Sequence, residues 1–457
     1  MTAAAFGSDE LRRIFGLPRN GTDSRFTSVS TDTRDLKPGS LFIALRGERF
    51  DGADFLEEAA ARGALGAVVP RGREDVKIDL EWFPVADPAR ALADLAAHYR
   101  MRRGARVVGV TGSSGKTTVK EMIGHALGGV LRVHRTRGNL NNQIGVPLSI
   151  LAAPEEAEVW VLELGSSAPG EIARLAEISA PDDAVVTTVG PAHLEGLGDE
   201  IGVMAEKMAL LRGAAPEGAV VVGEIPAVLP KEARRLRRDT VVAGLGPACD
   251  FVPDRWHVGP AGVAFERRGV EYRVGVGGEH HLRDALLAAA VAESLGVPAR
   301  EAALGLANYR PVGMRGALRQ LGRLTVVADC YNANPESFEA AIRYCIEAFP
   351  GRRLTAAVGS MLELGARAAE AHRAVAKRIV EAGFELVVAT GDFREAFESI
   401  SRPNGTTVLQ SEGPEDMWAA LGSHLTGEEV VLVKASRGVR LERVVERLEE
   451  QFGGATG

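Results

Sequence analysis

One stretch of the chain, VVGVTGSSGKTT at residues 107–118, combines the residue types and the spacing that bind phosphate. An apolar run, predicted to be a buried strand, leads into a glycine-rich turn and then into a helix that opens at Thr117. Glycines let backbone N–H groups approach an anion closely, and the helix adds the positive end of its dipole. Lys116 can reach the β- and γ-phosphates of a nucleotide, and the Thr117 hydroxyl can ligate Mg²⁺. Val110 stands where the strict motif has a glycine. The strand–loop–helix order nevertheless favours a nucleotide-binding loop over a structural turn.

Two further polar side chains follow predicted strands of the same region. The strand at 159–163 ends in Glu163, and the strand at 184–189 is followed by His193. In parallel sheets, ligands bind at the carboxyl ends of the strands. Glu163 is therefore a candidate Mg²⁺ ligand, with helix capping as the alternative, and His193 is a candidate metal or phosphate contact, with a structural role as the alternative. Lys207 lies in a predicted helix at 200–211, where the sequence alone predicts a solvated charge.

Two polar loops are candidate substrate contacts. RGNLNNQIGVP at 137–147 is rich in uncharged donors and acceptors, and STDTR at 30–34 is followed by Arg46 and FDG. The functional interpretation of the second loop is a pocket for an anionic, hydroxyl-rich ligand, and the alternative for both loops is a solvated surface. The candidate residues are Asn139, Asn142 and Gln143 in the first loop and Ser30, Thr33, Arg34 and Arg46 in the second.

The elements that would position these residues alternate between strands and helices, which predicts an α/β fold with parallel sheets. At 457 residues the chain is long enough for about three domains. We expect a small mixed α/β domain at 1–103, a central P-loop ATPase-type domain with a parallel sheet at 104–312, and a Rossmann-like domain at 313–457. The strand ends of the third carry Asp329, Asn332 and KASRG at 434–438, so two domains would close on two ligands.

Composition narrows the class of partner. The formal net charge is −7, which argues against a nucleic acid held by bulk charge. The three cysteines, Cys249, Cys330 and Cys345, are odd in number and form no CxxC motif, which favours reduced thiols. No signal peptide and no apolar run of membrane-spanning length is visible. We therefore expect a cytoplasmic protein without membrane insertion.

Taken together, these motifs resemble those of the Mur ligases, the ATP-dependent amide-forming enzymes of peptidoglycan precursor synthesis. GNLNNQIGVP and YNANP are similar to the branch of the family that adds D-alanyl-D-alanine, and no DNPR motif, which the diaminopimelate- or lysine-adding ligase would carry, is present. The motifs lie in the family's order over nearly the whole chain, and they are STDTRDLKPGSLFIALRGERFDG (30–52), VTGSSGKTT (110–118), RGNLNNQIGVP (137–147), ELG (163–165), AHLEGLG (192–198), YNANP (331–335), GSMLELG (359–365) and KASRG (434–438).

The resemblance implies ATP and Mg²⁺ as cofactors, UDP-N-acetylmuramoyl-tripeptide and D-Ala-D-Ala as substrates, and a monomer, the family's usual state. It implies that Lys116, Lys207 and His193 are catalytic, with Lys207 aligned to a lysine that is carbamylated in the family. The implied ATP contacts are Gly112, Ser113, Ser114, Gly115, Lys116, Thr117, Thr118, His280, Arg315 and Asn332. The implied metal site is Thr117, Glu163, His193 and Lys207. The implied substrate contacts are Ser30, Thr33, Arg34, Arg46, Asn139, Asn142, Gln143, Ser436 and Arg437.

The chain departs from the family pattern in places. The family usually has His-Asn-x-x-Asn where this chain has HHLRD at 280–284, before a helix expected over 282–295, and those asparagines help to hold adenine. Ser360 stands where an aspartate is common, Ala435 where a glycine is common, and Ala53 where a histidine often follows FDG. Three alternatives remain: another Mur-type ligase such as a folylpolyglutamate synthase, a nucleotide-switch protein, and a non-catalytic homologue. The chain contains no NKxD base-recognition motif, which argues against the nucleotide-switch protein.

Overall fold

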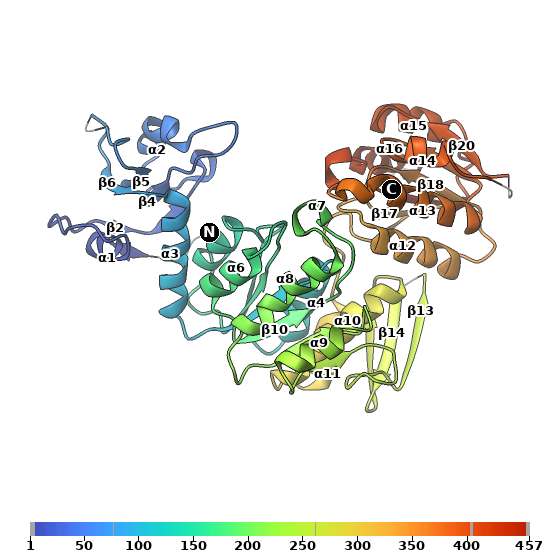
Figure 1. The fold of residues 1–457 in the computed structure, drawn as a ribbon, viewed down its shortest axis with the longest axis horizontal. Coiled ribbons are helices and arrows are strands. Elements are labelled where there is room, and N and C mark those ends of the chain that lie inside the picture. The colour runs from blue at the N-terminus through green and yellow to red at the C-terminus, as the bar shows by residue number, and fades with distance from the viewer. Residues whose placement is uncertain (1–4, 76, 261, 403–404, 454–457) are drawn as a thin grey trace.

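The computed structural model describes residues 5–75, 77–260, 262–402 and 405–453, and it contains three α/β domains that follow one another in chain order (Figure 1). We name each domain by its main sheet. The N-terminal sheet has the strand order β3-β4-β5-β6, the central sheet β12-β11-β10-β7-β9-β8, and the C-terminal sheet β16-β17-β21-β18-β19-β20. The predicted α/β class with three domains is confirmed.

The N-terminal sheet is parallel throughout, and a short antiparallel pair, β1–β2, lies beside it. Its helix α3 packs against the central domain, where the Tyr99 ring stacks on Trp160 with 6.1 Å between ring centroids and the Tyr99 hydroxyl donates to Ala153 O at 2.9 Å. The elements are β1 (Phe6–Gly7), α1 (Ser8–Ile14), β2 (Arg25–Phe26), β3 (Ser28–Ser30), η1 (Thr33–Asp35), β4 (Ser40–Ile43), η2 (Gly52–Phe55), α2 (Leu56–Ala61), β5 (Gly66–Pro70), β6 (Glu81–Val85) and α3 (Pro88–Met101).

The central sheet is also fully parallel, and β7 lies inside it between β10 and β9. Because alternate residues of a strand face opposite ways, Val107 packs with the core under α6 and α8 while Val108 packs with the core under α4 and α10. The elements are β7 (Arg106–Thr111), α4 (Lys116–Leu127), β8 (Val133–Arg135), α5 (Gly145–Leu151), β9 (Val159–Glu163), α6 (Glu171–Ser179), β10 (Asp183–Val186), α7 (Leu194–Leu197), α8 (Glu200–Gly213), β11 (Val220–Gly223), α9 (Leu229–Leu236) and β12 (Val241–Ala243).

A three-stranded antiparallel sheet follows in the chain and packs its apolar face on α10. Its strands are β13 (Arg255–Gly259), β14 (Gly262–Arg267) and β15 (Val270–Val274), and the two helices after it are α10 (Glu279–Ser294) and α11 (Ala299–Ala307). The helix expected over 282–295 thus begins earlier, at Glu279, so His280 lies in its first turn.

The C-terminal sheet is parallel except for its edge strand β16, which is antiparallel to β17. The helices α12 and α13 cover one face, and α15 and α16 cover the other. The elements are β16 (Ala317–Leu321), β17 (Leu324–Asp329), α12 (Pro335–Ala348), β18 (Leu354–Val358), η3 (Gly365–Arg367), α13 (Ala368–Glu381), β19 (Leu386–Ala389), α14 (Phe393–Glu398), β20 (Thr407–Gln410), α15 (Pro414–Gly422), β21 (Val430–Lys434), η4 (Arg437–Val439) and α16 (Glu442–Phe452).

Two observations bear on the expectations from composition. The described part of the chain has no helix both long and apolar enough to cross a membrane. The thiols of Cys249, Cys330 and Cys345 are all free.

Candidate active site

A cleft of about 930 Å³ lies where the central and C-terminal domains meet. On the central side it is lined by the loop after β7 and by residues that follow β9 and β10, and on the C-terminal side by residues that follow β17, β18 and β21. All of these residues follow the carboxyl ends of parallel strands, where α/β proteins bind ligands. The volume is within the range of pockets for small molecules.

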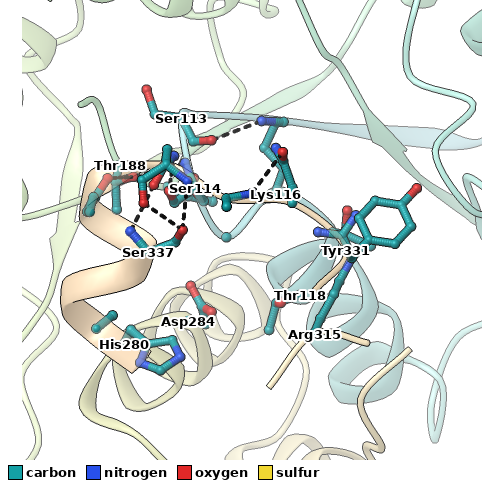
Figure 2. Close-up of a pocket in the computed structure, with 18 of the residues that line it drawn as sticks. Ser113, Ser114, Lys116, Thr118, Thr188, His280, Asp284, Arg315, Tyr331 and Ser337 are labelled. Atoms are coloured by element: carbon teal, nitrogen blue, oxygen red, sulfur yellow. Dashed lines mark hydrogen bonds between the residues drawn. The ribbon is translucent and has the colours of Figure 1, made fainter. Parts of the chain in front are cut away.

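The phosphate-binding loop is built by two glycines in conformations that side chains rarely adopt. Gly112 has φ 148°, and a Cβ there would lie 2.0 Å from Thr187 Oγ1, while Gly115 has φ 81° and precedes the first turn of α4. Lys116 folds back over this loop and donates from Nζ to Gly112 O at 2.7 Å and to Ser113 O at 3.3 Å (Figure 2). Burial lowers the pKa of Lys116. The loop therefore presents a confined cation beside the N-terminus of a helix, as an anion site requires.

The first turn of α12 reaches this loop from the C-terminal domain. Asn334 is the N-cap of α12 in a capping box with Ser337, and its Nδ2 also donates to Ser114 Oγ at 3.0 Å. Glu336 accepts from Thr188 Oγ1 at 3.4 Å, and burial raises the pKa of the Glu336 carboxyl. The two domains are thus joined by side-chain hydrogen bonds at the phosphate-binding loop itself.

Residues of α10, of the linker before β16 and of the loop after β17 line another part of the cleft. Figure 2 shows Asp284 and His280 of α10 below the loop, and Arg315 against the ring of Tyr331 to one side. The Arg315 guanidinium carbon lies 3.8 Å from the Tyr331 ring centroid. Burial, with a smaller contribution from Glu336, raises the pKa of Asp284 well above its usual value. Burial also lowers the pKa of His280 well below its usual value.

Glu163 is the acidic residue of the cleft that best fits a divalent cation. Its side chain is buried, and Oε1 accepts from Asn141 Nδ2 at 2.8 Å. Its second oxygen, Oε2, is buried without a hydrogen-bond partner among the described residues and lies 3.6 Å from Lys120 Nζ. A buried carboxylate oxygen without a hydrogen-bond partner, in a cleft that Thr117 also lines, is suited to a hard cation such as Mg²⁺. Within the described ranges, no three His, Cys, Asp or Glu side chains are grouped closely enough to hold a metal ion by themselves.

His193 precedes α7 on the central rim, and its Nδ1 lies 2.6 Å from Glu363 Oε2 of the C-terminal domain. Figure 1 shows α7 next to the C-terminal domain. Like Glu163, His193 lines the cleft.

The prediction that Lys207 is a solvated charge is wrong. Its side chain is fully buried in α8, and Nζ donates to Ser166 Oγ at 2.7 Å. Desolvation, together with the charge of Lys116, lowers the pKa of Lys207 to about 7. The amine therefore exists in part without its proton near neutral pH, which is the form that reacts with electrophiles.

The structure gathers most of the predicted site residues around one cleft. Its lining includes Ser113, Ser114, Gly115, Lys116, Thr117, Thr118, Asn139, Asn142, Gln143, Glu163, His193, His280, Arg315, Asn332, Ser436 and Arg437. Two others do not line the cleft: Gly112 belongs to the phosphate-binding loop, and Lys207 is buried in the core. Four lie elsewhere, at the carboxyl edge of the N-terminal sheet: Ser30, Thr33, Arg34 and Arg46.

The cleft residues that the sequence reasoning missed include Asn334, Glu363, Asp284 and Glu336. Asn334 and Glu363 lie inside the quoted motifs YNANP and GSMLELG, so the motifs pointed to them without giving them a role. Asp284 was noted only as a departure from the family pattern. Nothing in the sequence indicated that Glu336 faces the phosphate-binding loop.

Models of the family match three consecutive stretches of the chain. They are described as "Mur ligase family, catalytic domain" at residues 25–100, "Mur ligase middle domain" at 110–292, and "Mur ligase, glutamate ligase domain" at 314–437. The resemblance inferred from the motifs is thereby confirmed.

Individual relatives match this chain over nearly its full length. The UDP-N-acetylmuramoyl-tripeptide–D-alanyl-D-alanine ligase of Escherichia coli is 36% identical over 96% of this chain and 98% of its own. The crystal structure of MurF from Acinetobacter baumannii superposes with a TM-score of 0.88 at 27% identity, over 99% of this chain and 100% of its own. MurF from Thermotoga maritima, solved in complex with ADP, superposes with a TM-score of 0.81 at 32% identity, over 93% of this chain and 97% of its own. With three family models and a relative of this similarity, the chain belongs to the Mur ligase family.

Proposed function

We propose that this Mur ligase joins D-Ala-D-Ala to UDP-N-acetylmuramoyl-tripeptide at the expense of ATP, and so forms the pentapeptide precursor of peptidoglycan. The observation that carries the proposal is the cleft, in which a phosphate-binding loop from one domain faces the polar strand ends of another. The names of the E. coli and other relatives support the substrate pair. We further propose that the enzyme is cytoplasmic and works as a monomer.

The proposed reaction has two steps. The terminal carboxylate of the tripeptide attacks the γ-phosphorus of ATP, so that ADP leaves and an acyl phosphate forms. The amine of D-Ala-D-Ala then attacks the acyl carbon, and inorganic phosphate leaves with the amide formed. Lys116 would exchange its contacts with Gly112 O and Ser113 O for the β- and γ-phosphates. Closure of the C-terminal domain would exclude the water that otherwise hydrolyses the acyl phosphate.

A divalent cation, bound by Thr117, Glu163 and His193, would neutralise the charge that develops on the transferred phosphoryl group. The buried, unpartnered Oε2 of Glu163 supports this site. The family's carbamylated lysine corresponds to Lys207. Its lowered pKa supports the modification, because only the neutral amine can take up CO₂. The carbamate would convert this buried cation into an anion on the metal side of the site.

The base contacts of ATP follow from α10. Of the family's two adenine-holding asparagines, one is replaced by His281 and the other by Asp284, whose pKa is raised by burial. A protonated carboxyl presents an O–H donor beside an acceptor oxygen, as an asparagine amide presents its N–H donors beside a carbonyl acceptor. Asp284 would thus keep the contact in its neutral form, with His280 and Arg315 beside it. In the N-terminal domain at 1–103, Ser30, Thr33, Arg34 and Arg46 would bind the nucleotide-sugar end of the substrate. The central domain at 104–312 would bind ATP, and the C-terminal domain at 313–457 would supply Asn332, Ser436 and Arg437.

The experiment is release of phosphate from ATP and Mg²⁺, measured with each substrate alone and with both together. We expect release only when UDP-N-acetylmuramoyl-tripeptide and D-Ala-D-Ala are both present. Lys116→Ala should abolish it, whereas replacement of the exposed Lys231 of α9 by alanine should not. Release with folate and glutamate, or with another nucleotide-sugar peptide, would contradict the substrate assignment but leave the chemistry. ATP binding without release for any acceptor would contradict the enzymatic function.

A further inference from the structure

The ring of Tyr331 is contacted by two arginines that come from different segments of the chain. The Arg315 guanidinium carbon lies 3.8 Å from the ring centroid (Figure 2), and that of Arg437 lies 5.1 Å from it. Arg315 belongs to the linker before β16, Tyr331 to the loop after β17, and Arg437 is the first residue of η4, after β21. All three line the cleft. Because the negative face of an aromatic ring attracts a guanidinium, Tyr331 is suited to hold both side chains.

Within the described residues, the two arginines lack an anionic partner. Neither guanidinium forms an ion pair or a hydrogen bond with another described residue, whereas the neighbouring cation Lys434 pairs with Asp329. Two like charges beside one ring repel each other, and an anion bound there removes this repulsion. The planar fork of arginine matches the oxygens of carboxylates and phosphates. The pair is therefore suited to bind anionic groups of the substrates.

The backbone around the ring is fixed from two sides. The Tyr331 N–H donates to Met314 O at 3.1 Å, which holds the loop after β17 beside the linker. Ser436 is buried, and its Oγ donates to Ala333 O at 3.4 Å, which holds the start of η4 beside the same loop. These contacts bring the three segments together, and the ring is then the group that both guanidiniums share.

The two arginines lie on different sides of the cleft. Burial lowers the pKa of Lys116, and the charge of Arg315 adds to this effect, so Arg315 lies on the side of the phosphate-binding loop. Arg437 is exposed and belongs to the C-terminal domain. The first is therefore placed for the nucleotide, and the second for a ligand held by the C-terminal domain.

The proposed reaction has an anionic group left over for Arg437. The phosphates of ATP and the attacking carboxylate of the tripeptide have to meet at the phosphate-binding loop. The terminal carboxylate of D-Ala-D-Ala takes no part in the chemistry, and the amine at the other end has to stay free to attack. The carboxylate is thus the charged group by which the protein can hold and orient the dipeptide.

We propose that Tyr331 is a positioning residue whose ring holds Arg315 against the nucleotide and Arg437 against the terminal carboxylate of the incoming dipeptide. One stacked unit then orients both ligands, and it selects acceptors that carry a free carboxylate. The inference rests on the proposed function for the identity of the dipeptide. It adds Tyr331, which no motif assigned a role, to the site.

The first test measures KM values of the full-length enzyme by phosphate release. Tyr331→Leu should raise the KM for ATP and the KM for D-Ala-D-Ala by about 5- to 10-fold each, the effect of one lost cation–π contact per ligand. The KM for UDP-N-acetylmuramoyl-tripeptide should not change. Tyr331→Phe keeps the ring and should restore both KM values to within about two-fold of the wild type. Unchanged KM values in Tyr331→Leu would contradict the role of Tyr331.

The amide of D-Ala-D-Ala identifies the group that Arg437 holds. The amide lacks the negative charge, so its KM should be raised in the wild type. Tyr331→Leu should then raise it by less than about two-fold more, because the contact that the ring supports is already lost. An effect of Tyr331→Leu on the amide as large as on the dipeptide itself would contradict the carboxylate assignment.

Phe251 is the matched control for loss of an aromatic ring. The Arg267 guanidinium carbon lies 3.8 Å from its ring centroid, and neither residue lines the cleft. Phe251→Leu should leave all three KM values unchanged, although the ring is buried and its loss should lower stability. Equal KM changes in Phe251→Leu and Tyr331→Leu would show a general structural effect and contradict positioning by Tyr331.

NMR of the arginine Nε–H groups reads the stack without turnover. The signals of Arg315 and Arg437, assigned with Arg315→Lys and Arg437→Lys, should show the ring-current shift in the wild type and in Tyr331→Phe and lose it in Tyr331→Leu. ADP should then perturb the signal of Arg315, and D-Ala-D-Ala that of Arg437. Signals that are the same in the wild type and Tyr331→Leu would contradict the role of Tyr331. A wild type that shows these shifts but releases no phosphate with any acceptor would contradict the proposed function and leave the role of Tyr331 standing.

Discussion

Lys120, Lys207 and Lys434 are fully buried around the cleft, and they differ in their partners. Lys434 pairs with Asp329, and Lys120 pairs with Glu121 at 2.9 Å and with Glu163 at 3.6 Å. The hydrogen-bond partner of Lys207 is the neutral hydroxyl of Ser166. A buried ammonium without a close counter-charge loses its proton easily, which is why the lysine beside the hydroxyl is the one suited to react with CO₂.

The lowered pKa of Lys207 predicts how its modification depends on pH. With a pKa of about 7 the amine is mostly protonated at about pH 6 and mostly neutral at about pH 8, so carbamate formation should rise over that interval. The unfolded chain keeps the proton up to its ordinary pKa near 10.5, so the free energy of unfolding should also rise with pH between the two values.

The measurement is ¹³C NMR of the protein equilibrated with ¹³CO₂ at several pH values. A carbamate signal that grows with pH and disappears in Lys207→Ala is expected, and a short-chain carboxylate should restore part of the lost activity of that variant. Lys434, which is paired with a carboxylate, is the internal control and should give no signal. A signal that survives in Lys207→Ala would contradict the assignment.

Lys120 predicts a large effect on stability. In Lys120→Met, Glu121 keeps Arg135 as a partner at 2.8 Å, but buried Glu163 loses its nearest cation. Leaving a buried charge unpaired costs about 3–5 kcal/mol, and urea denaturation should show a loss of that size.

The second substitution identifies the cause. Adding Glu163→Gln to Lys120→Met removes the unpaired charge and should restore part of the stability. The exposed pair Lys377 and Glu381 offers the matched control, since Lys377→Met should cost less than about 1 kcal/mol. If the double variant is no more stable than Lys120→Met, loss of packing rather than of charge is the cause.

Asn334 has two roles: it is the N-cap of α12, and its side chain donates a hydrogen bond to Ser114 of the phosphate-binding loop. Asn334→Ala should lose about 1 kcal/mol of stability from the cap. It should also lose the bond to Ser114 and raise the KM for ATP. Asp87 caps α3 by accepting from the Ala89 N–H, far from the cleft, and is the matched control. Asp87→Ala should lose similar stability and leave the KM for ATP unchanged. Equal effects on the KM for ATP in the two variants would contradict the role of Asn334 at the phosphate-binding loop.

The helices and strands that were predicted from sequence are those with a clear local signal. Four β-branched or large apolar residues in a row before a charged one, as in Val159–Glu163 and Val430–Lys434, are typical of buried strands in a parallel sheet. The edge strands β16 and β20 carry polar residues such as Arg319 and Gln410, so no apolar run marked them.

The burial of Lys207 had a signal that was not used. Along α8, Val203, Leu210 and Leu211 share one face of the helix with Lys207, and all three are buried. A lysine in the middle of an apolar face is placed in the core by its neighbours. The contacts between domains had no such signal. The rule that parallel strands end at one edge applies within a sheet, and it says nothing about how Glu363 or Glu336 of one domain docks on another.

The whole molecule separates the nucleotide-sugar site from the nucleotide cleft. Ser30 ends β3 and Arg46 follows β4, at the carboxyl edge of the N-terminal sheet and outside the cleft lining. Arg46→Ala should therefore raise the KM for UDP-N-acetylmuramoyl-tripeptide about 10-fold, the effect of one lost charge-assisted hydrogen bond. The KM for ATP should not change. Arg62, paired with Glu58 on α2, is the control, and Arg62→Ala should change neither KM. A parallel rise of both KM values in Arg46→Ala would contradict separate sites.

The hydrogen bonds of Asn334 and Glu336 and the His193–Glu363 contact join the central and C-terminal domains at residues that line the cleft. If these contacts must break before the product leaves, the C-terminal domain, with its whole sheet and covering helices, has to swing through the solvent. Such a motion is opposed by friction, whereas transfer of the phosphoryl group inside the closed cleft is not. Where release limits turnover, sucrose or glycerol would slow the enzyme in step with solvent viscosity, and a single turnover of the bound substrates would keep its rate.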